Sequence, residues 1–91
     1  MPKITRVEKR DGSFERFSSK KLTNSIAKAL AQSGTKNGKI ANKLAKEAIK
    51  LLEKRHEKTV PVEHIKETVE FVLVKNKLPK AAKYYLLYRY M

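Results

Sequence analysis

Apolar residues recur at every third or fourth position in four segments of this sequence, which is the spacing of one face of an α-helix. The segments cover about residues 19–33, 38–55, 61–75 and 79–91. Short stretches containing Gly, Asn, Lys or Pro separate them, and such stretches end helices. Because each amphipathic face must be buried against another, the pattern predicts a bundle of four helices.

These apolar stripes also define the expected core, which is built mainly from Leu, Ile, Val and Ala. Ser18 and Ser19 suit the N-terminal cap of the first helix, and Gly34 suits its end. The stripe residues are Leu22, Ile26, Ala29 and Leu30 in the first helix; Ile40, Ala41, Leu44, Ala45, Ala48, Ile49, Leu51 and Leu52 in the second; Val62, Ile65, Val69, Val72 and Leu73 in the third; and Ala82, Tyr85, Leu86 and Arg89 in the fourth.

The stretch VEKRDGSFERF, residues 7–17, predicts a β-hairpin, because Asp-Gly between short strand-like runs is a hairpin signal. Two registers fit. A two-residue loop of Asp11 and Gly12 would mix apolar and charged residues on both faces. A three-residue loop that ends in a left-handed Gly12 pairs Val7 with Glu15 and gives one face a core-like character. We expect the second register, because strands bury one face.

The hairpin and the helices together predict an α+β fold, in which a small N-terminal β-hairpin or sheet caps a four-helix bundle. The chain has 91 residues, which predicts a single domain over residues 1–91. Its hydrophobic content of 41% indicates a folded domain rather than a disordered one.

Several classes of protein are excluded by what the sequence lacks. It has no cysteine, so disulfides and thiolate metal sites are excluded. Its two histidines, His56 and His64, stand apart in the sequence, so we expect no metal site. No Ser-His-Asp set, cysteine nucleophile or P-loop motif is present, and we expect no catalytic residues and no enzyme activity. No apolar run approaches the ~18 residues of a membrane span, and no signal-peptide pattern begins the chain, so we expect a cytoplasmic protein.

The formal net charge is +13, which favours anionic partners such as nucleotides, nucleic acid or acidic lipid heads. Many of the lysines lie on predicted outer helix faces with the spacing of ordinary solvated positions, so for most of them a surface that only keeps the protein soluble fits equally well. Four basic residues differ from these: Lys9 and Arg10 flank the rigid turn, and Lys20 and Lys21 lie in the first turn of the first helix. A helix N-terminus favours anions, so these cations suit a triphosphate, although a solvated rim of the hairpin fits the same spacing.

The C-terminal end, YYLLYRY, has four tyrosines in seven residues. Interleaved with Arg89, these rings would suit the stacking of nucleic acid bases. Tyrosines at helical spacing also serve core and interface packing, which is the interpretation that we favour.

Four parts of the sequence together resemble the ATP-cone domain: VEKRDGSFERF, the start of the first helix, VPVEHIKETVEFVL and AAKYYLLYR. This domain is the nucleotide-binding regulatory module at the N-terminus of many ribonucleotide reductases, and it also occurs behind a zinc ribbon in the bacterial repressor of their genes. The resemblance extends from about Ile4 to Arg89. It implies a short β-sheet over four helices, as the periodicity predicts.

The resemblance implies that the chain binds an adenine nucleotide, ATP or dATP, with Mg²⁺ on the phosphates, and performs no chemistry. Asp11 and Gly12 keep the turn-forming role that the hairpin signal gives them. In this family a small polar residue often stands at the cap of the third helix, where this chain has Val60-Pro61-Val62, and Lys66 is sometimes His. These departures leave the choice between ATP and dATP open. The implied nucleotide-binding residues are Val7, Lys9, Arg10, Glu15, Lys21, Val62, Ile65, Lys66 and Arg89.

The resemblance further implies a regulatory role for a stand-alone ATP cone. It would sense nucleotide levels and act through oligomerisation, or through docking to a partner such as a ribonucleotide reductase subunit. The alternative prediction is a basic nucleic-acid-binding module, on the strength of the +13 charge and the tyrosine-rich end.

Overall fold

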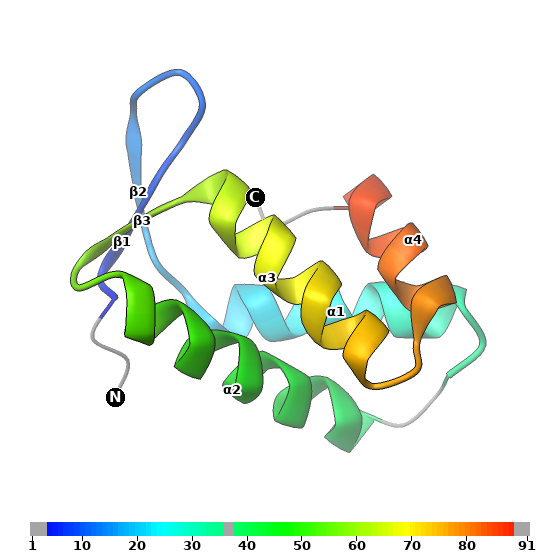
Figure 1. Cartoon of the computed structure of the whole chain (residues 1–91). Coiled ribbons are helices and arrows are strands. Elements are labelled where there is room, and N and C mark those ends of the chain that lie inside the picture. Colours follow the sequence, from blue (N-terminus) through cyan, green and yellow to red (C-terminus); the bar gives the residue numbers. More distant parts are fainter. Residues whose placement is uncertain (1–3, 36–37, 89–91) are drawn as a thin grey trace.

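The structure is a computed structural model that describes residues 4–35 and 38–88. The elements follow one another as β1 (Arg6–Glu8), β2 (Phe14–Arg16), α1 (Ser19–Gln32), α2 (Gly38–Arg55), β3 (Thr59–Pro61), α3 (Val62–Lys75) and α4 (Pro79–Tyr88). A small sheet lies at one end of four helices (Figure 1), so the predicted α+β architecture is confirmed.

The helices form a closed ring of neighbours, because α1 and α3 each pack against both α2 and α4. Every predicted stripe residue in the described part of the chain is buried or half-buried, which confirms the helical periodicity. Tyr85 is 0% exposed and is one of the largest buried side chains. It therefore packs in the core and is not available to stack on a base. Arg89 lies outside the described residues.

The hairpin adopts the second of the two registers, with Val7 paired to Glu15. The amide of Lys9 donates to the carbonyl of Ser13 over 2.8 Å, and the amide of Gly12 donates back to the carbonyl of Lys9 over 3.0 Å. Gly12 has a φ of +87°, a left-handed conformation that costs glycine little. The loop is thus the predicted three-residue loop, and its last residue fixes the shape of the tip.

A third strand, β3, corrects the predicted polar loop after the second helix. It runs parallel to β1, pairs Val60 with Val7, and gives the sheet the order β2-β1-β3. The carbonyl of Lys58 also accepts from the amides of Thr5 and Arg6, over 2.9 and 3.1 Å. A three-residue strand carries too few residues to show a period of two, so its pairing depends on β1 and not on its own pattern.

The helix ends follow the expected chemistry with one correction. Ser18 caps α1 by accepting from the amide of Lys21 over 3.1 Å, and Gly34 follows the helix with a φ of +95°. The third predicted helix, over about residues 61–75, was expected to begin with Pro61 in its first turn. Pro61 instead ends β3 and immediately precedes α3, with a φ of −64° and an extended ψ of 140°.

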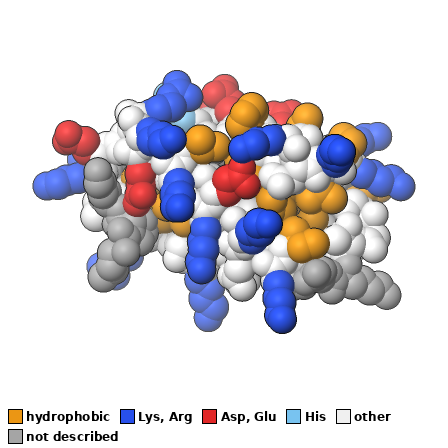
Figure 2. All heavy atoms as spheres, turned by 60° about the horizontal axis from the view of Figure 1, so that its bottom comes forward, with side chains coloured by type: hydrophobic (Ala, Val, Ile, Leu, Met, Phe, Trp, Pro, Cys, Tyr) orange, Lys and Arg blue, Asp and Glu red, His pale blue; other side chains and the backbone are white. Residues whose placement is uncertain are grey.

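Lysine and arginine side chains are spread over the surface rather than gathered into one patch on the face that Figure 2 shows. Net charge alone therefore does not locate a binding site on this face. Among the described helices, none is both long and apolar enough to pass through a bilayer.

Candidate nucleotide site at the hairpin tip

The hairpin tip projects from the end of the bundle beside the first turn of α3 (Figure 1), and α1 begins directly after β2. Three stretches of chain thus bring charged side chains to one place. The rigid turn carries Lys9 and Arg10, and Asp11 stabilises it by accepting from the amide and the hydroxyl of Ser13 over 2.9 and 2.6 Å. These hydrogen bonds lower the pKa of Asp11.

Glu15 joins the hairpin to the start of α1. Its two carboxylate oxygens lie 3.2 Å from Lys9 Nζ and 3.1 Å from Lys21 Nζ. Its side chain is 24% exposed. Partial burial raises the pKa of Glu15, but the hydrogen bonds and charges of Lys21 and Lys9 outweigh that effect, and the net pKa lies below its ordinary value. Glu15 is therefore a carboxylate that holds two ammonium groups side by side.

Glu63 has the same arrangement with Arg10 and Lys66. Its carboxylate lies 2.6 Å from Arg10 Nε and 3.5 Å from Lys66 Nζ, so it joins the hairpin to α3. The hydrogen bond from Arg10 lowers the pKa of Glu63, and the same contact raises the pKa of Arg10. Sequence reasoning missed Glu63; the available signal was an acidic residue three positions before Lys66 at the start of a helix.

The ion pairs around Glu15 and those around Glu63 share the hairpin tip, because Lys9 and Arg10 are neighbours in the sequence. Together they contain four cations and two carboxylates, and with the carboxylate of Asp11 in the turn a small excess of positive charge remains at the tip. The first turn of α1, which carries Lys21, has no acidic residue. An anion with several charges fits this balance better than a single carboxylate does.

The model of the ATP cone domain family matches residues 5–91. This chain belongs to the ATP-cone family. ATP cones are nucleotide-binding regulatory domains rather than catalytic ones. A comparison with curated proteins found no match.

The other predicted site residues of this ATP cone occupy different places. Val7 and Ile65 are 1% and 0% exposed, so they belong to the core beneath the charged groups. Val62 is half-buried at the start of α3. Arg89 lies outside the described residues. The structure thus places Lys9, Glu15 and Lys21 in one ion-pair group, and Arg10 and Lys66 in a second group around Glu63. Contact of a nucleotide with any of the predicted residues stays a prediction.

The two histidines are in contact, so the interpretation of them as separate residues was wrong. His56 Nε2 and His64 Nδ1 are 2.9 Å apart, and both side chains are half-buried. His56 follows α2 and His64 lies in the first turn of α3, so the short β3 brings them together. Burial lowers the pKa of His56, and the charges of His64 and Arg55 add to the effect. In residues 4–35 and 38–88, no third His, Cys, Asp or Glu joins them as a metal ligand.

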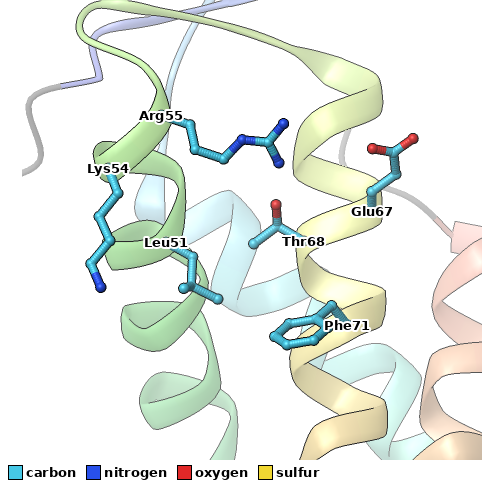
Figure 3. Close-up of a pocket in the computed structure, with 6 residues that line it drawn as sticks. All are labelled: Leu51, Lys54, Arg55, Glu67, Thr68 and Phe71. Atoms are coloured by element: carbon cyan, nitrogen blue, oxygen red, sulfur yellow. The ribbon is translucent and has the colours of Figure 1, made fainter.

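A groove of about 370 Å³ lies between α2 and α3, away from the hairpin tip. Leu51 and Phe71 face each other across it, and Arg55 extends from the end of α2 toward α3 (Figure 3). Phe71 is 57% exposed. None of the predicted nucleotide-binding residues lines this groove; its lining consists of Leu51, Lys54, Arg55, Glu67, Thr68 and Phe71.

Proposed function

We propose that this ATP cone binds ATP or dATP at the hairpin tip, with the triphosphate on Lys9, Arg10, Lys21 and Lys66. The observation that carries the proposal is that two carboxylates, Glu15 and Glu63, hold these four cations from three stretches of chain at the hairpin tip. A triphosphate offers several charged acceptors to such donors, and charge-assisted hydrogen bonds are the strong ones. The left-handed Gly12 holds Lys9 and Arg10 in place before the ligand arrives.

Glu15 is the proposed acceptor for the adenine amine. In the nucleotide-free protein its oxygens hold Lys9 and Lys21. Once phosphates replace Glu15 as the partner of these two ammonium groups, its carboxylate can accept a hydrogen bond from the adenine amine. Guanine has no amine at the same ring position. The proposal therefore includes selectivity for adenine.

Mg²⁺ is the proposed companion of the phosphates. This ion binds proteins through one or two carboxylates together with substrate phosphates. The bound phosphates would supply oxygen ligands to the ion, and its contribution would be to offset the repulsion between them.

The proposed role is regulatory, without catalysis. A nucleotide that contacts the hairpin, α1 and α3 together would fix their relative positions, so the fraction of protein in this ordered form would follow the nucleotide concentration. We propose that the ordered form acts through oligomerisation, or through docking to a partner such as a ribonucleotide reductase subunit in the cytoplasm.

Thermal melts with ATP, dATP, GTP and CTP, each with and without Mg²⁺, test the proposal. A ligand that binds the native state alone stabilises it by about 2.7 kcal/mol at one hundred times its dissociation constant. For a domain of this size the melting temperature should rise by about 10 °C or more. Equal shifts with all four nucleotides, or no shift with ATP and dATP, would contradict adenine-nucleotide binding.

Binding of single-stranded nucleic acid is a second candidate function, and the groove between α2 and α3 favours it. The exposed Phe71 lines this groove together with Lys54 and Arg55, and an aromatic ring with basic side chains is the combination that stacks bases and attracts phosphates. Such binding should weaken by about 10³ or more between 50 and 200 mM salt if six phosphates are contacted. A nucleotide held at the hairpin tip should lose much less affinity over the same range.

A further inference from the structure

Glu63 occupies cations that the proposed site needs for phosphate. It reaches Arg10 from a position 53 residues away in the sequence, and it also contacts Lys66, so half of the four cations have this one carboxylate as their counter-ion. A phosphate oxygen and a carboxylate oxygen accept hydrogen bonds from the same donors. A triphosphate must therefore either displace Glu63 or bind next to its negative charge.

Comparison with Glu15 indicates which of the two occurs. Glu15 lies in the middle of β2, paired with Val7, and its side chain is 24% exposed. Glu63 is the second residue of α3, and its side chain is 40% exposed. Glu63 is thus less confined. It also lies in the first turn of a helix, where the free N–H groups and the helix dipole favour a carboxylate even without a cation beside it.

Charge leads to the same conclusion. A triphosphate beside Glu63 would place like charges a few ångströms apart, at a tip with only four cations to divide between them. Movement of Glu63 away from the tip removes that repulsion and frees the Nε–H of Arg10, which is the donor that Glu63 now uses.

We propose that Glu63 acts as an internal anion, which holds Arg10 and Lys66 in the nucleotide-free protein and gives them up when a triphosphate binds. This proposal rests on the proposed function of the hairpin tip. It makes Glu63 a residue that lowers nucleotide affinity, and it makes ligand binding release the hairpin tip from the carboxylate of α3. The exchange is an ion-pair swap in which no covalent bond forms or breaks.

Titration calorimetry with ATP, with and without Mg²⁺, tests this in the wild type, in Glu63→Gln and in Glu67→Gln. Glu67 lies one turn further along α3 and is exposed, so Glu67→Gln removes the same charge from the same helix away from the ion pairs. Two exposed ion pairs are worth up to about fivefold each, so Glu63→Gln should bind ATP roughly three- to tenfold more tightly than Glu67→Gln does.

Equal affinity in the two variants would overturn the proposal, as would weaker binding by Glu63→Gln, which would mean that Glu63 contacts the ligand or its Mg²⁺. If the wild type does not bind ATP at all, the proposed function and this inference fail together. If the wild type binds and the variants do not differ, the inference alone fails.

The NMR signal of the Arg10 Nε–H gives a second, independent measure. In the free proteins it should differ between the wild type and Glu63→Gln, because only the wild type has the carboxylate partner at 2.6 Å. In the ATP-bound proteins the two signals should coincide, because phosphate has replaced Glu63. A difference that persists in the bound state would show that Glu63 keeps Arg10, and would overturn the proposal.

Discussion

The hairpin tip and the groove between α2 and α3 both present basic side chains, but they hold them differently. At the tip, Lys9, Arg10, Lys21 and Lys66 all have carboxylate partners, and a left-handed glycine fixes the turn. In the groove, neither Lys54 nor Arg55 forms an ion pair with another residue of the described chain. An ordered cation loses less freedom when it binds an anion, so the same type of charge should give a specific site at the tip and a weaker, salt-sensitive one in the groove.

The largest effect should come from Gly12→Val. A Cβ at Gly12 meets no atom within 4 Å, so the cost arises only from the φ of +87°. Left-handed backbone costs a residue with a side chain roughly 1–2 kcal/mol, and that much stability should be lost in urea unfolding. ATP binding should disappear, because relaxation of the turn moves Lys9 and Arg10.

Gly34→Val is the matched control for that prediction. Gly34 has a similar φ of +95° and equally open surroundings, but it follows α1 at the end away from the hairpin. Both variants should lose similar stability, and only Gly12→Val should lose ATP. If both variants lost ATP binding, the loss would result from lower stability and not from a changed shape of the hairpin tip.

Lys9→Ala should lower ATP affinity by about ten- to a hundredfold, because a charge-assisted hydrogen bond is worth roughly 1.5–3 kcal/mol. Its melting temperature without nucleotide should change little, since the exposed pair with Glu15 is worth less than about 1 kcal/mol. The control is Lys58→Ala, whose exposed side chain lies just before β3. A similar small loss of affinity in both variants would indicate that positive charge in general, and not the site, attracts the nucleotide.

A smaller effect is expected from pH, through the burial of His56 and, secondly, the nearby charges of His64 and Arg55. The pKa of His56 is lowered in the folded protein, so the unfolded chain binds the proton more readily. The free energy of unfolding should therefore be highest above about pH 6.5, the ordinary histidine value, and should fall as the pH is lowered below it. Urea unfolding at pH 7.5 and 5.5 measures the change, and His56→Asn should reduce it. An unchanged pH dependence in that variant would assign the effect to other groups.

The smallest effect on stability should come from Phe71→Ala in the groove. Phe71 is 57% exposed, so its loss should change the free energy of unfolding by no more than about 0.5 kcal/mol. ATP affinity should stay unchanged, because the groove is separate from the hairpin tip. Titration of the variant with a single-stranded DNA 12-mer sharpens the comparison: weaker binding than the wild type would support the second candidate function.

The sequence by itself determined the helices, the core and the hairpin register. Helical periodicity repeats within four residues, and the stripes of Leu22 or Val69 can be read without knowledge of any other segment. The hairpin register follows from the requirement for a left-handed residue at Gly12 and for one buried face. Lys9, Arg10, Glu15 and Lys21 are the local members of the site. They are close in the sequence, so the hairpin and the start of α1 bring them together without a distant segment.

Only the tertiary structure decided the contacts between distant segments. The pairing of Val7 with Val60 and the ion pair of Arg10 with Glu63 each join residues 53 positions apart. The contact of His56 with His64 spans only 8 positions, yet it depends on how β3 turns the chain between two helices. A three-residue strand or a single carboxylate shows no repeating sequence pattern that could predict its partner. Its partner depends on where the packed helices place it. That is why Glu63 was absent from the predicted site and why the docking of α3 against the hairpin was needed to reveal it.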